Sequence, residues 1–187
     1  MPNYRRAREG NTYFFTLVTF QRQPILCLDE SRQLLREAIV MVRETHPFVV
    51  EAWVLLPDHM HCIWRLPEGD TGYSTRWGLI KSAFTKGAKG WLPTPPANAS
   101  RRKHREGTVW QRRFWEHMIR DERDFAAHCD YIHYNPVKHG YAPAPRDWPF
   151  STFHRAVREG RYPLDWGADP ALKNAMLPEP NKHHAEP

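Results

Sequence analysis

Residues 49–66 read VVEAWVLLPDHMHCIWRL, and this stretch decides the fold. Two runs of apolar, β-branched and aromatic residues, Val49–Leu56 and His59–Leu66, flank the dipeptide Pro57-Asp58. Such runs are typical of strands, and so short a connection predicts that the two strands pair antiparallel. The nearly continuous apolar run of Val49–Leu56 predicts a central strand that is covered on both faces.

The segments on either side of this hairpin predict further strands and helices. Thr12–Thr19 is rich in aromatic and β-branched residues and predicts a strand, and Thr108–Arg120 is expected to contain another. Apolar spacing and capping residues predict helices from Asp29 or Ser31 to about His46, over 75–91, from Asp121 or Asp124 to about Asn135, and a short one over 151–159. Pro136 is expected to break or kink the third of these. The order β-α-β-β-α-β-α predicts an α+β fold, a ferredoxin-like sandwich with a central antiparallel sheet and helices packed on it.

Length and composition predict one folded domain. The 187 residues are 41% hydrophobic, and we expect a single domain over residues 1–167. Within it, residues 1–10 form a basic arm and the proline-rich residues 93–107 a mobile loop. Residues 168–187 are expected to be a partly disordered tail. Three cysteines without CxxC spacing, the lack of a secretory signal, and the lack of an apolar run of about 20 residues predict a cytoplasmic protein without a membrane span.

The charge balance suggests a polyanionic partner. The formal net charge is +6, and aromatic residues make up 13% of the chain, several of them beside arginines. Aromatic rings can stack on nucleic-acid bases while guanidinium groups bind phosphates. The alternative is that most rings fill the core and the arginines are solvated.

His59-Met60-His61 is the sharpest local feature for chemistry. Residues i and i+2 of a strand face the same side, so the two imidazoles are expected to lie together as a pair of metal ligands, with a third ligand from elsewhere. Alternatively, one histidine is exposed and the other hydrogen-bonded within the sheet. Cys62 faces the opposite side of the strand, which disfavours a structural zinc site built from the two histidines and this thiol.

Tyr131 and Asn135 form the second feature. Positions i and i+4 share a helix face, and His128 lies one turn earlier on that face. The amide oxygen of Asn135 is a ligand of the kind that Mg²⁺ or Mn²⁺ accepts. The alternative is that Tyr131 packs in the core with its hydroxyl hydrogen-bonded.

Together the two features resemble a known family, the REP-associated tyrosine transposases of the HUH endonuclease superfamily. His59-Met60-His61 matches the HUH signature, and YIHYNPVKHG (131–140) matches the motif of the nucleophile helix. Three more blocks match in order, namely NYRRAREGNTYFFTLVT (3–19), WQRRFWEHMIR (110–120) and DWPFSTFHRAVREGRYPLDWG (147–167). The resemblance covers residues 3–167, and residues 93–107 are its main departure.

The resemblance implies a metal-dependent strand transferase, a transposase that cuts and rejoins single-stranded DNA beside the hairpins of repetitive extragenic palindromes. It assigns Tyr131 as nucleophile, forming a 5′-phosphotyrosine, and His59, His61 and Asn135 as ligands of Mg²⁺ or Mn²⁺. The DNA contacts expected from it are Arg5, Arg6, Arg8, Trp110, Arg112, Arg113 and Trp115. A monomer at the bacterial nucleoid is expected. No GxxxxGK[ST] loop is present, so no nucleotide cofactor is expected.

Two other functions use the same residues differently. A metal-dependent phosphoesterase with water as nucleophile would need the histidine pair but not Tyr131. A non-catalytic DNA-hairpin binding module would bind such DNA with strong salt dependence and never cut it. The roles of Glu116, His117 and His128 stay open at this point, with His128 a geometric candidate for the base that deprotonates Tyr131.

Overall fold

The computed structural model describes residues 10–92 and 109–169. Most of the predicted basic arm, including Arg5, Arg6 and Arg8, the whole of loop 93–107 and nearly all of the predicted tail lie outside these residues. The elements along the chain are β1 (Thr12–Val18), α1 (Asp29–Thr45), β2 (Val49–Leu55), β3 (His59–Arg65), α2 (Tyr73–Gly87), β4 (Trp115–Met118), α4 (Glu122–Lys138) and α5 (Phe153–Arg158). Two 3-10 turns, Phe20–Arg22 and Pro145–Asp147, complete them.

The sheet has the order β2-β3-β1-β4, and every neighbouring pair is antiparallel. The predicted hairpin is present, with Leu55 opposite Met60 and Val54 opposite His61. With α1 and α2 as the crossovers, this order is that of a ferredoxin-like sandwich, so the predicted α+β class is confirmed.

The predicted central position of the second strand is wrong, because β2 lies at the edge of the sheet and β3 lies inside it. Its apolar sequence has another cause. The chain around Ser151 covers this edge: Leu55 N–H donates to the carbonyl of Phe150 at 2.8 Å, and Thr152 N–H donates to that of Trp53 at 2.9 Å. A covered edge is dry and has its backbone groups paired, so it tolerates the composition of an inner strand.

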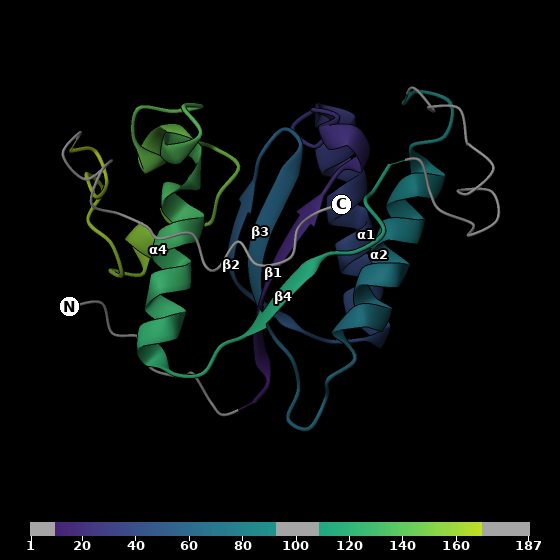
Figure 1. Ribbon diagram of the computed structural model, residues 1–187, viewed down its shortest axis with the longest axis horizontal. Helices are drawn as coiled ribbons and strands as arrows, with labels where there is room; N and C mark the ends of the chain where they lie inside the picture. The colour runs from purple at the N-terminus through teal and green to yellow at the C-terminus, as the bar shows by residue number, and fades with distance from the viewer. Residues whose placement is uncertain (1–9, 93–108, 170–187) are drawn as a thin grey trace.

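Helices cover both faces of the sheet (Figure 1). α1 and α2 pack together on one face, and α4 lies on the other. Consecutive side chains of β1 point to opposite faces of the sheet. Phe15 packs in the core under α1 and α2. Phe14 packs in the core under α4, with Ile63 and Ile132. Because side chains alternate along a strand, odd-numbered residues of β3 also face α4.

The starts of α1 and α4 differ in how they are capped. α1 begins at Asp29, but Leu28 is its N-cap residue and no side chain caps it. At α4 the Asp121 carboxylate accepts the backbone N–H of Asp124 at 2.8 Å, which fixes the first turn of this helix.

Within residues 10–92 and 109–169, no helix is both long and apolar enough to cross a membrane.

Candidate active site

His59 and His61 project side by side from β3 toward α4. Their ring centroids are 5.1 Å apart, and their exposed fractions are 5% and 4%. Cys62 points the other way, into the core under α1 and α2. The predicted pairing of the two imidazoles is therefore present, and a zinc site that adds Cys62 to them is not.

A second group holds each imidazole by its Nδ1 atom. His59 Nδ1 lies 2.6 Å from Asp58 Oδ1, and His61 Nδ1 lies 2.8 Å from Thr16 Oγ1. Histidines that bind metals usually use one nitrogen for the ion and hydrogen-bond the other to a carboxylate or similar group. His61 Nε2 is buried without a hydrogen-bond partner among the described residues, as expected of the atom left to bind an ion.

The surroundings keep both imidazoles neutral. Burial lowers the pKa of His59, although the neighbouring Asp58 carboxylate opposes this. Burial, with positive charge from His59, His139 and Lys138, holds the pKa of His61 well below its usual range. Only the neutral ring can coordinate a metal, so this environment favours binding at and below neutral pH.

Asn135 is brought to the histidines by an uninterrupted α4. Of the break or kink predicted at Pro136, the break is wrong, because α4 runs on to Lys138. Proline removes one intrahelical hydrogen bond, but Val137 is buried and His139 N–H donates to the Asn135 carbonyl at 3.0 Å, so the last turn is held. Asn135 is fully buried and lies close enough to His59 to oppose the fall in the pKa of this histidine. Among the described residues, neither of its amide atoms has a partner with the distance and angles of a hydrogen bond.

An amide buried in this way costs free energy unless something binds it. An ion held by His59, His61 and Asn135 would give the amide oxygen a partner. The three side chains therefore fit a divalent cation on grounds of burial and chemistry.

Tyr131 lies beside the histidine pair. Its half-buried ring is 5.0 Å from that of His61, centroid to centroid, and nearly perpendicular to it. The Lys138 ammonium lies over the same ring, 5.1 Å from its centroid. Tyr134 is directed elsewhere: it is 1% exposed and packs near Trp166. The structure thus brings together the four residues on which the sequence prediction depends.

The described residues that were expected to contact DNA differ in how far they are exposed. Trp110 is 6% exposed and packs on Phe84, so its expected role in stacking on bases is not supported and we assign it to the core. Arg112 and Arg113 are exposed, and Trp115 is half-buried against Phe14.

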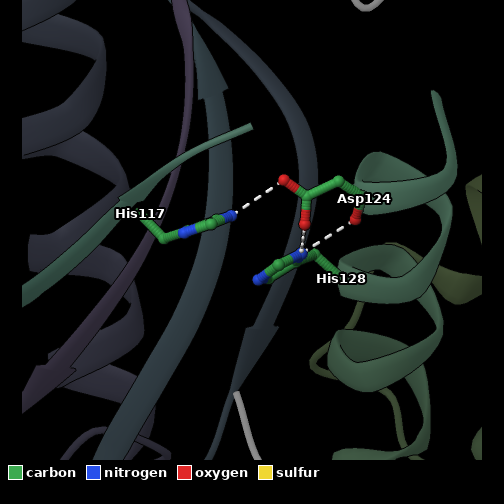
Figure 2. Close-up of side chains that lie close together, drawn as sticks. All are labelled: His117, Asp124 and His128. Atoms are coloured by element: carbon green, nitrogen blue, oxygen red, sulfur yellow. Dashed lines mark hydrogen bonds and ion pairs between the residues drawn. The ribbon is translucent and has the colours of Figure 1, made fainter. Parts of the chain in front are cut away.

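Two arrangements of histidines near the site were not predicted from the sequence, although the roles of His117 and His128 were left open there. The His139 ring lies 5.1 Å from that of His59, centroid to centroid, and His139 is exposed. His117, Asp124 and His128 form a separate cluster between β4 and α4 (Figure 2). Asp124 and His128 are four residues apart on α4, so spacing alone places them on one helix face, whereas the approach of His117 depends on how α4 packs against β4.

Comparisons with known proteins identify the family. No protein-family model matches the chain. It is 48% identical, over 90% of its length and 93% of the relative, to the REP-associated tyrosine transposase of Escherichia coli (strain K12). It is 46% identical, over 92% of its length and 97% of the relative, to a Haemophilus influenzae protein assigned to the same group. A solved structure of a REP-associated tyrosine transposase bound to a REP hairpin matches with a TM-score of 0.71 and 46% identity, covering 90% of this chain and 93% of that one. The chain belongs to the family of REP-associated tyrosine transposases.

Proposed function

We propose that this protein cuts and rejoins single-stranded DNA next to the hairpins of repetitive extragenic palindromes. Tyr131 is the nucleophile, and His59, His61 and Asn135 hold a Mg²⁺ or Mn²⁺ ion. The observation that carries the proposal is the contact between the Tyr131 ring and His61. In the same site, His61 Nε2 and the Asn135 amide have no hydrogen-bond partner within the part of the chain that the structure describes. A divalent ion is implied by the family, and its identity is part of the proposal.

The phenol of Tyr131 must lose its proton to attack. A phenol has a pKa near 10, so ionising it at pH 7 costs about 4 kcal/mol. The Lys138 ammonium over the ring offsets part of this cost, since it stabilises the negative charge of the phenolate. When bound, a divalent ion would polarise the scissile phosphate and stabilise the leaving oxygen.

The reaction is a balanced transesterification. Tyr131 Oη forms a bond to the scissile phosphorus as the bond from phosphorus to the 3′ oxygen breaks. The products are a 5′-phosphotyrosine and a 3′-hydroxyl that takes up a proton. Attack by a 3′-hydroxyl on the phosphotyrosine reverses the step and frees Tyr131. Because one phosphate diester replaces another, rejoining needs no nucleotide cofactor.

Recognition of the DNA is proposed from the solved relative, whose structure holds a REP hairpin. Arg112 and Arg113 are exposed and lie just before β4, and they are candidates for contacts with phosphates. Trp115, the half-buried first residue of β4, is a candidate for a contact with a base. Arg5, Arg6 and Arg8 stay candidates from the sequence. A protein with this substrate would act at the bacterial nucleoid, and we expect it to act as a monomer.

The decisive experiment tests for a covalent adduct. The protein is incubated with an end-labelled hairpin oligonucleotide carrying a single-stranded flank, with Mg²⁺ or Mn²⁺, and resolved on a denaturing gel. We expect a labelled protein band that Tyr131→Phe abolishes and a chelator prevents. Tyr134→Phe is the matched control, because the Tyr134 hydroxyl is buried with no hydrogen-bond partner in residues 10–92 and 109–169, and its removal should leave the adduct intact.

Other outcomes would support the rival functions. Cleavage by Tyr131→Phe at the native rate, without an adduct, would replace the proposal with a phosphoesterase that uses water. Tight, salt-sensitive binding without cleavage in either metal would replace it with a hairpin-binding module. His59→Ala and His61→Ala should abolish cleavage while DNA affinity changes little, and Asn135→Ala should raise the metal concentration needed for half-maximal rate.

A further inference from the structure

His117, Asp124 and His128 form a second cluster of metal-ligand side chains, outside the proposed active site. Each offers one ligand atom, and these atoms all lie within 4.8 Å of one another. Figure 2 shows the Asp124 carboxylate between the two imidazoles, reached by His117 from β4 and by His128 from the next turn of α4. His117 Nε2 lies 2.8 Å from Asp124 Oδ2, and His128 Nδ1 lies 3.1 Å from Asp124 Oδ1.

The hydrogen bonds within the cluster leave one buried nitrogen without a partner. His128 Nδ1 also lies 2.8 Å from the backbone carbonyl of Asp124, but its Nε2 has no hydrogen-bond partner among the described residues. The His128 side chain is 8% exposed, so water does not readily replace the missing partner. A buried imidazole with one nitrogen on a carbonyl oxygen and the other unpartnered has the environment typical of a metal ligand.

The donor set selects the kind of ion. Two imidazole nitrogens and one carboxylate suit Zn²⁺, Co²⁺ or Ni²⁺, whereas Mg²⁺ prefers oxygen ligands and retains its waters. Three protein ligands leave a tetrahedral ion one further position. The His117 side chain is 26% exposed, so solvent can reach the cluster from that side.

The cluster and the active site share no residue but have a common neighbour. The Phe14 ring is 4.8 Å from that of His128 and 5.9 Å from that of Tyr131, between centroids. An ion bound by the cluster would join β4 to the first turns of α4, the helix that carries Tyr131 and Asn135.

We propose that His117, Asp124 and His128 bind a Zn²⁺ ion or a similar transition-metal ion. This ion is separate from the Mg²⁺ or Mn²⁺ of the cleavage site. His128 would bind the ion through Nε2 and keep its Nδ1–H on the Asp124 backbone carbonyl, so binding replaces only the hydrogen bond between His117 and Asp124 with metal–ligand bonds. It releases the proton of the His117 nitrogen that becomes a ligand. Its effect is to stabilise the packing of α4 on the sheet.

The test measures Co²⁺ and Zn²⁺ binding in a protein whose cleavage site is disabled. The background carries His59→Ala and His61→Ala, and also His183→Ala and His184→Ala, so that neither the proposed active site nor the adjacent histidines of the tail contribute. We expect one equivalent of Co²⁺ to bind with a visible d–d absorption band, in the presence of millimolar Mg²⁺, and Zn²⁺ to displace it. Zn²⁺ should also raise the melting temperature by several degrees.

Adding His117→Ala to this background should weaken Co²⁺ binding at least tenfold and remove the Zn²⁺-dependent rise in melting temperature. His117→Gln is a second variant in case His117→Ala does not fold, because glutamine can still hydrogen-bond to Asp124. Far-UV circular dichroism checks that each variant is folded. The matched control is His154→Ala, a partly exposed histidine of α5. Absence of binding by the folded background protein would overturn the proposal, as would Co²⁺ affinity unchanged in both His117 variants. Both readouts are metal binding and thermal stability, not DNA cleavage, so neither result depends on the proposed function.

Discussion

The Lys138 ammonium lies 5.1 Å from the centroid of the Tyr131 ring, over its face. At this separation a positive charge favours the phenolate over the phenol by about 1 kcal/mol or more, depending on how strongly solvent screens it. We therefore expect Lys138→Met to slow formation of the covalent adduct about tenfold at neutral pH. The rate of the variant should recover as the pH rises toward the pKa of a phenol.

Single-turnover rates at saturating DNA, measured from pH 6 to 9, check this prediction. Saturating DNA removes any effect of Lys138 on affinity. Lys138→Arg should keep most of the rate, and Lys86→Met, an exposed lysine on the opposite side of the sheet, should not change it. A rate for Lys138→Met that is low by the same factor at every pH would mean that Lys138 does not act on the ionisation of Tyr131.

The hydrogen bond between Thr16 and His61 is expected to tune metal affinity. With Nε2 directed at the ion, His61 carries its proton on Nδ1 and donates it to Thr16 Oγ1 at 2.8 Å. Thr16→Val keeps the shape of the side chain but removes the acceptor, which should weaken Mn²⁺ binding about 10- to 100-fold. Calorimetric titration measures it. Thr12→Val, on the same strand but without a histidine contact, is the control; equal affinity of the two variants would contradict the prediction.

The features that follow from local periodicity were predicted from the sequence. The pairing of His59 with His61 depends only on the alternation of a strand, and the shared direction of Tyr131 and Asn135 only on the spacing of a helix. The approach of Tyr131 to His61 is different, because it requires α4 to lie on one particular face of the sheet. The motif resemblance implied that approach, whereas spacing alone favoured a core position for Tyr131.

The errors arose where tertiary contacts override local preference. β2 has the composition of a central strand because the segment around Ser151 seals its edge, a contact between residues about 100 positions apart in the chain. Pro136 continues α4 because its neighbours are buried in the core. Of the two caps predicted for α4, Asp121 has that role, and the Asp124 carboxylate instead accepts the Arg120 backbone N–H and contacts His117 and His128, a set of contacts that local sequence does not predict.

Asp130 predicts a pH dependence of stability. Burial raises the pKa of this carboxyl group, although the Tyr162 hydroxyl, which donates to Asp130 Oδ1 at 2.5 Å, opposes the shift. A group whose pKa is higher in the folded state binds more protons there, so its contribution to stability is lost as the pH rises through the folded pKa. Asp130→Asn keeps an acceptor for Tyr162 but does not titrate. We therefore expect its free energy of unfolding to increase relative to that of the native protein as the pH rises from about 4 to about 7. Urea unfolding across this range checks it, and a constant difference between the two proteins would contradict the cause assigned here.

Gly167 and Gly160 offer a matched test of how the segment after α5 supports the nucleophile helix. Both have left-handed backbones, with φ of +72° and +71°. A Cβ on Gly167 would lie 3.0 Å from Pro145 Cγ and 3.1 Å from Tyr134 Cδ2, whereas one on Gly160 would meet nothing within 4 Å. Gly160→Ala should therefore cost only the backbone strain of about 1 kcal/mol. Gly167→Ala should cost the same backbone strain plus about 1–3 kcal/mol of overpacking.

Because Tyr134 lies between Tyr131 and Asn135 on α4, we also expect Gly167→Ala to slow adduct formation while Gly160→Ala does not. Equal free energies of unfolding for the two variants, measured in urea, would mean that Pro145 and Tyr134 move aside without cost and that this contact does not position α4.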